Sequence, residues 1–170
     1  MKRKRILLLS DTHGTFDDFI EKYARQADEI WHAGDIGNME VLEKLEALAP
    51  VRAVYGNIDG HRLRLAVPEY LFWEDGNQKF LLLHIGGYPG RYSPRAKELL
   101  ARFRPTVFMA GHSHILKVMP DKGRNLLFMN PGAAGLSGFH KQRTMLRFVL
   151  DDGGLHDLEV IERPRRREIL

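Results

Sequence analysis

The stretch ILLLSDTHG, residues 6–14, places a short continuous apolar run directly before a polar turn. Four consecutive aliphatic residues that stop at a turn predict a buried β-strand. The turn contains Asp11 and His13, two residue types that bind metal ions through oxygen and nitrogen. An isolated Asp-x-His pair is far more often a turn or capping pair than a metal site. This stretch therefore indicates a metal site only together with other motifs of the chain.

The same arrangement, an apolar run followed at once by polar residues, recurs four times further along the chain. The runs at 30–33, 51–55, 80–83 and 107–110 lead to Gly34-Asp35, Gly56-Asn57-Ile58-Asp59, His84 and Gly111-His112-Ser113-His114. Ligands of α/β domains bind at the carboxyl ends of the strands. If these ends are neighbours in one sheet layer, the polar side chains converge, and the preceding glycines allow the turns that direct them.

The convergent set contains more donors than one small ion can use. Two Asp, one Asn and four His fit two ions about 3.5–4 Å apart that share one carboxylate. Asp35 is the expected bridge because it stands alone in its motif. Neutral imidazoles and an amide leave such a pair with residual positive charge, which favours an anionic substrate and an ionised bridging water.

The chain has no cysteine, which excludes disulfides and thiolate ligands. Nitrogen and oxygen donors suit manganese, our first choice, with iron, zinc, nickel or cobalt as alternatives. The absence of cysteine also suits a reducing compartment.

Short apolar runs alternate with amphipathic stretches over the first half of the chain, and strands dominate later. Helices are expected over 16–27, 39–48 and 93–103, the last with Ser93 as cap and Pro94 at its first position. Further strands are expected at 70–73, 115–119, 126–129, 145–150 and 158–161. The pattern predicts one α/β domain over residues 1–170, a mixed sheet system covered by helices.

The basic pI of 9.4 arises at the two ends of the chain. Eight of the 26 basic residues lie within 1–5 and 163–170; the body between them has 18 basic and 21 acidic residues, a net charge of −3. A chain-wide nucleic-acid-binding face is therefore not supported. Solvated ends are one reading, and contacts of these ends with phosphate backbones or acidic partners are the other.

No apolar stretch approaches the roughly 18 residues of a membrane helix. The run after the basic N-terminus stops after four residues, short of the about 7–15 that a signal peptide needs. We therefore expect a cytoplasmic protein that does not bind membranes.

The order Asp-x-His, Gly-Asp, Gly-Asn-x-Asp, His, Gly-His-x-His resembles the calcineurin-like metallophosphoesterase superfamily. The short chain is similar to its compact single-domain bacterial and archaeal phosphodiesterases, over Ser10 to about Gly132 and including Asn130-Pro131-Gly132. The resemblance implies a four-layer sandwich of two mixed β-sheets flanked by α-helices. It further implies one ion on Asp11, His13 and His114, a second on Asn57, His84 and His112, and Asp35 between them.

The resemblance also implies the reaction. A hydroxide between two divalent ions would attack a small phosphodiester, with Asp35, Asn57, His84 and His112 expected as the catalytic ligands. One departure matters: many larger members carry His directly after the Gly-Asn pair to protonate the leaving group, and here that position is Ile58. The acid would then be solvent, His61 or His32.

Several residues keep two readings. His61 is either the acid or an exposed loop residue, and His32 is either an acid or a packed residue that supports the site. His140 either contacts the substrate cleft or is an exposed loop residue. Asp59 either orients a ligand loop, as carboxylates beside metal sites do, or is a turn residue.

Three other functions are compatible with the sequence. A non-catalytic scaffold on the same fold, similar to the retromer subunit of this superfamily, would have lost ligands. A nuclease or nucleic-acid-binding module would use the basic ends, and a hydrolase with a single ion would fill one site only. A homodimer is also left open.

Overall fold

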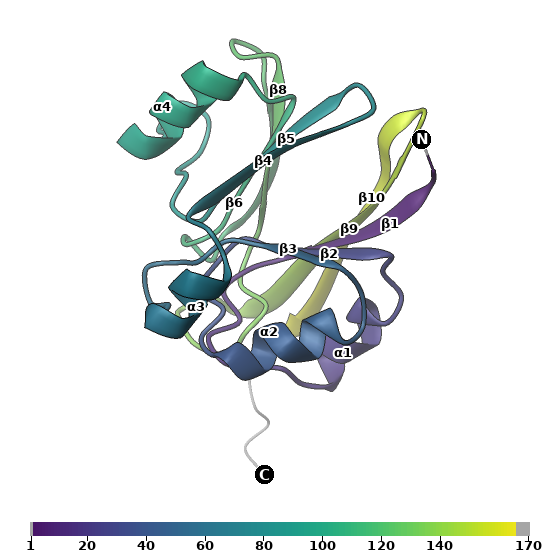
Figure 1. Cartoon of the computed structure of the whole chain (residues 1–170), viewed down its shortest axis with the longest axis vertical. Helices are drawn as coiled ribbons and strands as arrows, with labels where there is room; N and C mark the ends of the chain where they lie inside the picture. The colour runs from purple at the N-terminus through teal and green to yellow at the C-terminus, as the bar shows by residue number, and fades with distance from the viewer. Residues whose placement is uncertain (1, 166–170) are drawn as a thin grey trace.

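The computed structural model describes residues 2–165, and its strands form two five-stranded sheets. Sheet 1 has the order β10-β9-β1-β2-β3 and sheet 2 the order β4-β5-β6-β8-β7 (Figure 1). The strands of sheet 1 are β1 (Lys4–Leu9), β2 (Glu29–His32), β3 (Val51–Ala53), β9 (Gln142–Asp151) and β10 (Gly154–Pro164). Those of sheet 2 are β4 (Tyr70–Asp75), β5 (Gln78–Leu83), β6 (Val107–Ala110), β7 (Leu116–Asp121) and β8 (Leu126–Pro131).

Both sheets are mixed, with parallel strands where the polar turns lie. In sheet 1, β1, β2 and β3 run parallel, whereas β9 and β10 are antiparallel to their neighbours. In sheet 2, β5, β6 and β8 run parallel, and β4 and β7 form antiparallel edges. The parallel strands of each sheet therefore send their carboxyl ends to one edge of that sheet.

The helices begin where the sequence supplies capping side chains. In α1 (Asp18–Ala24) Asp17 accepts a bond from the Ile20 amide, and in α2 (Met39–Glu46) Asn38 accepts from the Val41 amide. Ser93 caps α4 (Pro94–Phe103), with Pro94 at the first position where its missing N–H costs nothing. A fourth helix, α3 (His61–Ala66), starts at Gly60 without a side-chain cap.

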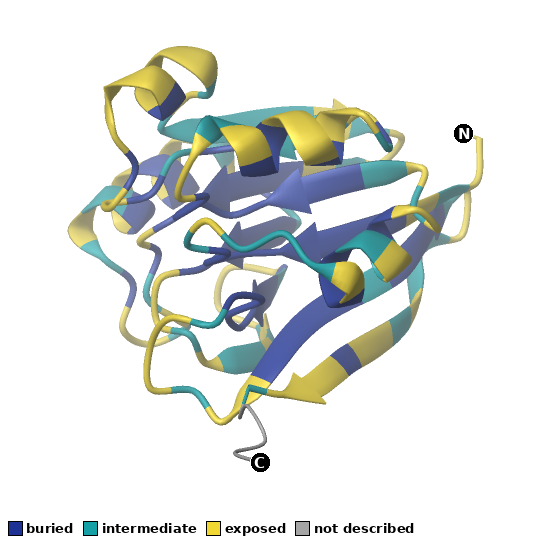
Figure 2. Ribbon diagram, turned by 90° about the horizontal axis from the view of Figure 1, so that it is seen from below, coloured by how far each residue is buried: buried dark blue, intermediate teal, exposed yellow. Residues whose placement is uncertain are grey.

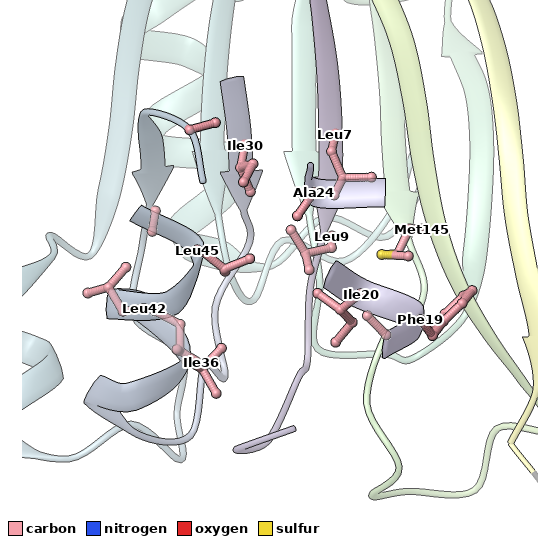
Figure 3. Packing of buried hydrophobic residues seen from close by; sticks show 14 of the residues in the cluster. Leu7, Leu9, Phe19, Ile20, Ala24, Ile30, Ile36, Leu42, Leu45 and Met145 are labelled. Carbon is pink, nitrogen blue, oxygen red and sulfur yellow. The ribbon is translucent and has the colours of Figure 1, made fainter. Parts of the chain in front are cut away.

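Three hydrophobic clusters separate four layers. The first lies between sheet 1 and helices α1 and α2, where Leu7 and Leu9 of β1 meet Ile20 and Leu45 (Figure 3). The second fills the space between the sheets around Trp31. The third packs α4 on sheet 2. Figure 2 shows the central strands buried while the helices expose one side, as amphipathic elements do.

This architecture confirms the predicted sandwich of two mixed sheets with helices. Within the elements, α1 is shorter than the expected 16–27, and α3 was not expected at all. The final strand reaches from 154 to 164 rather than 158–161, because pairing with β9 continues along the hairpin. The basic C-terminal end is described only as far as Arg165; its remaining residues lie outside the described part of the chain.

Within residues 2–165, no helix combines the length and apolar character that a membrane span requires.

Candidate metal centre

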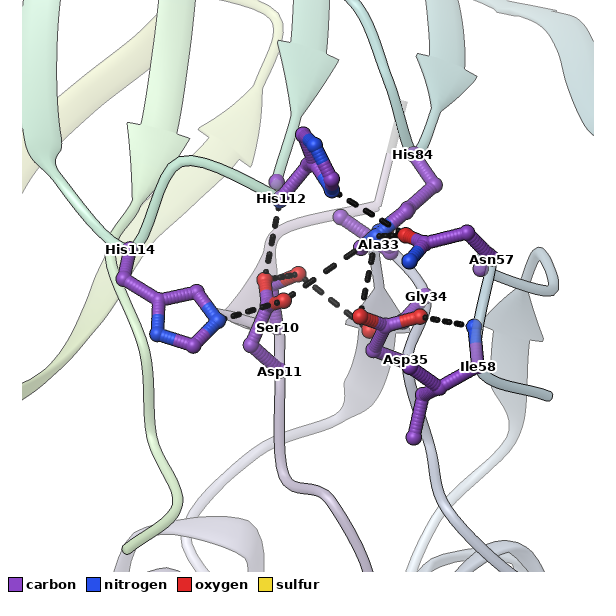
Figure 4. A network of polar contacts seen from close by, with 12 residues as sticks. Ser10, Asp11, Ala33, Gly34, Asp35, Asn57, Ile58, His84, His112 and His114 are labelled. Atoms are coloured by element: carbon purple, nitrogen blue, oxygen red, sulfur yellow. Dashed lines mark hydrogen bonds and ion pairs between the residues drawn. The ribbon is translucent and has the colours of Figure 1, made fainter. Parts of the chain in front are cut away.

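The seven predicted ligands come together, but from both sheets rather than from one. Asp11, Asp35 and Asn57 follow β1, β2 and β3 of sheet 1, whereas His84, His112 and His114 follow β5 and β6 of sheet 2 (Figure 4). The idea that these strand ends are neighbours in one sheet layer is therefore wrong. The two sheets instead bring their carboxyl edges to a common place, and loops on either side face one another.

The two carboxylate oxygens of Asp11 have different contacts, one with hydrogen-bond donors and the other with imidazole rings. Oδ2 accepts bonds from Ser10 Oγ at 2.6 Å and from the His112 amide at 3.0 Å. Oδ1 has no hydrogen-bond partner within residues 2–165, although it is buried. It lies 3.1 Å from His114 Nε2 and 3.6 Å from His13 Nε2. Asp11, His13 and His114 thus present three donor atoms to one point.

Asp35 is arranged in the same way. Its Oδ1 accepts from the Ile58 amide at 3.0 Å, and its Oδ2 lies 3.2 Å from His84 Nε2. Asp35, His84 and His112 form a second convergent group. The Oδ2 atom also lies 3.4 Å from His13 Nε2, which belongs to the first group. One carboxylate oxygen therefore faces both groups, which is the position that a bridging ligand needs.

Asn57 completes the second group. Its Oδ1 lies 3.0 Å from His84 Nε2 and 3.0 Å from His112 Nδ1. The His84 Nδ1–H donates to the Ala33 carbonyl at 2.7 Å, so in the neutral ring Nε2 carries a lone pair. That lone pair faces two oxygen acceptors, and such an arrangement is stable only with a cation, a proton or a metal ion, between them.

The backbone at the site is held in a conformation that L-residues rarely adopt. Five of the seven ligands, Asp11, His13, Asp35, His112 and His114, have φ between +45° and +71°. Only three other non-glycine residues among the described ones share this feature. Such conformations cost of order 1–3 kcal/mol each and persist where the surrounding structure imposes them, often at functional sites.

Gly56 and Gly111 are required because neighbouring loops approach their backbones closely. From the sequence, these glycines were expected only to allow turns. A Cβ on Gly56 would lie 2.1 Å from Asp35 Oδ1, and one on Gly111 would lie 2.1 Å from Ser10 Oγ. Gly34 differs because its φ of +101° itself needs glycine. The glycines before Asn57 and His112 therefore make room for neighbouring loops of the centre.

Asp59 ties the ligand loops together. It is buried and accepts from the amides of Ile36, Gly37 and Gly56 at 2.8–3.1 Å. It thereby joins the loop after Asp35 to the loop that carries Asn57. Of the two readings of Asp59, the structure supports the one in which it orients a loop.

Two residues that support the predicted ligands, Ser10 and Asn130, were not assigned this role from the sequence. Ser10 donates to Asp11, and its place directly before the first ligand was the available signal. The Asn130 amide donates to the Gly111 carbonyl at 3.0 Å and to Ser113 Oγ at 3.1 Å. Its Oδ1 accepts from the Gly132 amide, so the Asn-Pro-Gly motif holds the loop between His112 and His114.

The sequence model described as the calcineurin-like phosphoesterase superfamily domain matches residues 5–153. The chain belongs to this superfamily. A probable metallophosphoesterase of Methanothermobacter thermautotrophicus is 28% identical over 166 residues, 91% of this chain and 90% of that protein. The family predicted from the motifs is therefore confirmed.

Solved structures share the fold at lower identity. A crystal structure of a predicted phosphoesterase from Streptococcus pneumoniae has a TM-score of 0.68 at 22% identity and covers 100% of this chain and 94% of its own. Vps29 of Entamoeba histolytica in complex with Zn²⁺ has a TM-score of 0.62 at 19% identity, covering 93% of this chain and 98% of its own.

The donors of this superfamily member fit a pair of divalent ions. Ligands at about 2.1 Å from one ion lie about 3.0–3.4 Å from each other at tetrahedral or octahedral angles. The distances within the two groups, 3.0–3.6 Å, fall near this range. Asp11 Oδ1 and His13 Nε2 are buried without a hydrogen-bond partner in the described chain. The assignment of each residue as a ligand stays a prediction.

The charges of the centre are strongly coupled. Burial opposes ionisation of Asp11, but contacts with His114 and His13 outweigh it and hold the pKa of Asp11 well below its ordinary value. Burial likewise opposes ionisation of Asp35, and the contact with His84 still lowers its pKa. The Asp11 carboxylate raises the pKa of His13. Both carboxylates are thus ionised near neutral pH, as metal binding requires.

The candidate acids take different places. His61 is exposed at the first residue of α3, and the described contacts include none between it and the seven ligands. His32 is fully buried, 3.0 Å from Thr12 Oγ1, and its Nδ1 accepts from the Gly34 amide at 3.1 Å. This is the packed, supporting reading of His32. Ile58 is 47% exposed where larger relatives were expected to carry His.

His140 lies beside the first ligand group. Its ring packs edge-on against His114 with centroids 5.2 Å apart, and its Nε2 donates to the Gly135 carbonyl at 2.9 Å. It is partly buried rather than a freely exposed loop residue. Arg165 holds the same loop by donating to the carbonyls of His140 and Leu136.

Proposed function

We propose that this protein is a two-metal phosphoesterase that hydrolyses phosphodiesters. The observation that carries the proposal is the position of Asp35 Oδ2, which lies 3.4 Å from His13 of one donor group and 3.2 Å from His84 of the other. A shared carboxylate lessens the repulsion between two cations and fixes their separation. Two-metal sites of this kind support in-line displacement at phosphorus.

Divalent cations held by these residues would supply the Lewis acidity that ionises a water molecule and polarises the phosphoryl oxygens. The chain's own part is positional. Backbone amides hold one oxygen of Asp11 and of Asp35, so the other oxygen of each has a fixed direction. The Ala33 carbonyl fixes the ring of His84, and Asn57 places its amide between His84 and His112.

At the position where larger relatives are expected to carry a proton-donating His, this chain has Ile58, which cannot donate a proton to the leaving group. Esters with stable leaving groups, such as phenoxides, should therefore react fastest, with solvent or His61 as the source of the proton. The preference for a diester over a monoester rests on the resemblance to compact phosphodiesterases.

Hydrolysis of bis(4-nitrophenyl) phosphate tests the proposal. Protein stripped with a chelator should lose activity and regain it on addition of Mn²⁺, with Fe²⁺, Zn²⁺, Ni²⁺ and Co²⁺ tested in parallel. Activity that survives complete stripping, as verified by elemental analysis, would end the proposal.

A non-catalytic scaffold is the main rival, because a Vps29 shares the fold. All seven positions of this chain nevertheless keep side chains able to bind metal. A scaffold predicts metal binding without turnover on any ester, so measuring both quantities on one sample separates the two functions.

The contacts of the basic N-terminal end weaken the proposal of a nucleic-acid-binding protein. Lys4 pairs with Glu29 and Asp75, and Arg5 pairs with Asp28. These partners neutralise charge that a phosphate backbone would need. Salt-dependent binding of single-stranded DNA that is lost on charge-neutralising substitutions at residues 2–5 would restore this reading.

A further inference from the structure

A cavity of about 480 Å³ opens directly beside the second donor group. Asn57 and His84 form part of its wall, and most of the remaining wall is apolar, built from Tyr55, Leu83 and Ile85. The cavity is within the size range of pockets that hold small organic ligands. Because two predicted ligands line it, any group that fills the cavity would lie next to a phosphoryl group at the centre.

The wall nearest Asn57 also carries a fixed positive charge. The Arg64 guanidinium lies over the Tyr55 ring at 4.5 Å, and its Nε donates to the Asp59 carbonyl at 2.7 Å. No carboxylate within residues 2–165 pairs with Arg64. By contrast Arg95, which also lines the cavity, is paired with Glu69 and Glu98. A planar cation of this kind can stack on an aromatic ring and attract a nearby phosphate.

A second cavity, of about 500 Å³, lies between α1 and the β9–β10 pair, away from the predicted metal centre. None of the seven predicted ligands lines it. Its Arg147 is paired with Glu159, and Arg5 is paired with Asp28. Of these two cavities, the one beside Asn57 combines a mostly apolar wall with contact with the predicted metal centre.

Resting on the proposed function, we propose that this cavity, the ester pocket, holds one organic group of the substrate. It would select phosphodiesters that carry an uncharged, apolar group at least as large as an aromatic ring. Tyr55, Ile85 and Arg64 would determine this specificity, whereas the seven ligands would act on the phosphoryl group common to all substrates.

Phosphonates test the ester pocket without ambiguity, since each has a single organic group to place. Calorimetric titration of Mn²⁺-loaded protein should show phenylphosphonate binding about tenfold or more tightly than methylphosphonate, as expected for burial of an aromatic ring. In Ile85→Ser this ratio should fall at least threefold. The matched control is Ile115→Ser, because Ile115 is also exposed and also directly follows a predicted histidine ligand, but does not line the pocket.

A second pair of variants guards against a local folding effect. Tyr55→Ala removes the aromatic wall beneath Arg64, and Tyr88→Ala removes a tyrosine that lies beneath Lys117 at the same distance, 4.5 Å, outside the pocket. The ratio should fall in Tyr55→Ala and stay unchanged in Tyr88→Ala. Circular dichroism and bound Mn²⁺ should match the wild type in the variants compared.

Hydrolysis of bis(4-nitrophenyl) phosphate by the same samples separates the two proposals. Suppose that the protein hydrolyses the diester but binds both phosphonates equally, or that the affinity ratio falls by the same factor in Ile85→Ser and Ile115→Ser. Either result would overturn the ester pocket and leave the proposed function intact. Absence of turnover with any of the five ions would overturn the proposed function, and the ester pocket with it.

Discussion

At the scale of single residues, the centre is built from carboxylates whose two oxygens have separate tasks. One oxygen of Asp11 and one of Asp35 accept bonds from backbone amides, while the other faces imidazoles. The same division explains how buried carboxylates remain ionised. Asp35 Oδ2 faces histidines of both donor groups, so Asp35 is the predicted bridge.

Asp35→Asn should therefore weaken both metal positions together. The substitution removes the shared charge, so bound Mn²⁺ should fall well below two per chain and turnover should fall by about 100-fold or more. Even residues that only support a metal ligand contribute about 10–100-fold. Elemental analysis and hydrolysis assays measure the two effects. Asp28→Asn, which changes a surface carboxylate paired with Arg5, is the control; a fully occupied, active Asp35→Asn protein would show that the bridge is misassigned.

The sequence was informative about these residues because each follows an apolar run. Six of the seven predicted donors form two compact groups, and the seventh, Asn57, adjoins the second group. The contact of His140 with His114 could not be predicted, because it depends on the path of the loop at 136–141. A Cβ on Gly138 in that loop would lie 2.3 Å from His114 Nδ1, a constraint that only coordinates reveal.

At the scale of elements, the loop after β3 connects the fold to the centre. Gly56 packs against Asp35, Asn57 faces two histidines, and Asp59 binds three amides. The loop leads into α3, a helix of six residues in which only Leu63 is buried. So short a helix, without a capping side chain, leaves no clear periodic signal in the sequence, and it was missed for that reason.

Gly56→Ala should disturb Asp35 although it adds a single methyl group. The new Cβ would lie 2.1 Å from Oδ1 and 2.3 Å from the backbone nitrogen of Asp35. We expect a stability loss of about 1–3 kcal/mol and weaker Mn²⁺ binding, measured by urea unfolding and metal titration. In the same loop, the Cβ added by Gly60→Ala would have no atom within 4 Å. This substitution should lower the free energy of unfolding by about 1 kcal/mol or less. Equal effects of both substitutions would contradict this account of Gly56.

At the scale of the whole molecule, the centre exists because two sheets meet at their carboxyl edges. The sequence indicated the strands and their polar ends, and it indicated the sandwich through the family resemblance. Strand order and the pairing of β6 with β8 depend on contacts between distant segments, which periodicity does not record. The meeting of the predicted metal ligands of sheets 1 and 2 thus depends on the packing of the core around Trp31.

Packing also determines how stability varies with pH. Burial lowers the pKa of His32 to about 4, below the about 6.5 of an exposed histidine. As the pH falls, His32 is therefore protonated in the unfolded chain before it is protonated in the folded chain. The free energy of unfolding that is present above pH 6.5 decreases by roughly 3 kcal/mol as the pH falls toward 4. In urea unfolding of metal-free protein, the stability of wild type should fall more steeply across this range than that of His32→Gln. Equal slopes would show that His32 is not held neutral.

Loops from both sheets are predicted to hold a pair of ions around Asp35. Crystals grown with Mn²⁺ and measured near the manganese absorption edge test this prediction directly. The anomalous difference map should show two peaks about 3.5–4 Å apart, one among Asp11, His13 and His114 and the other among Asn57, His84 and His112, with Asp35 between them. A single peak, or peaks away from these side chains, would show that the protein does not hold a pair of ions around Asp35.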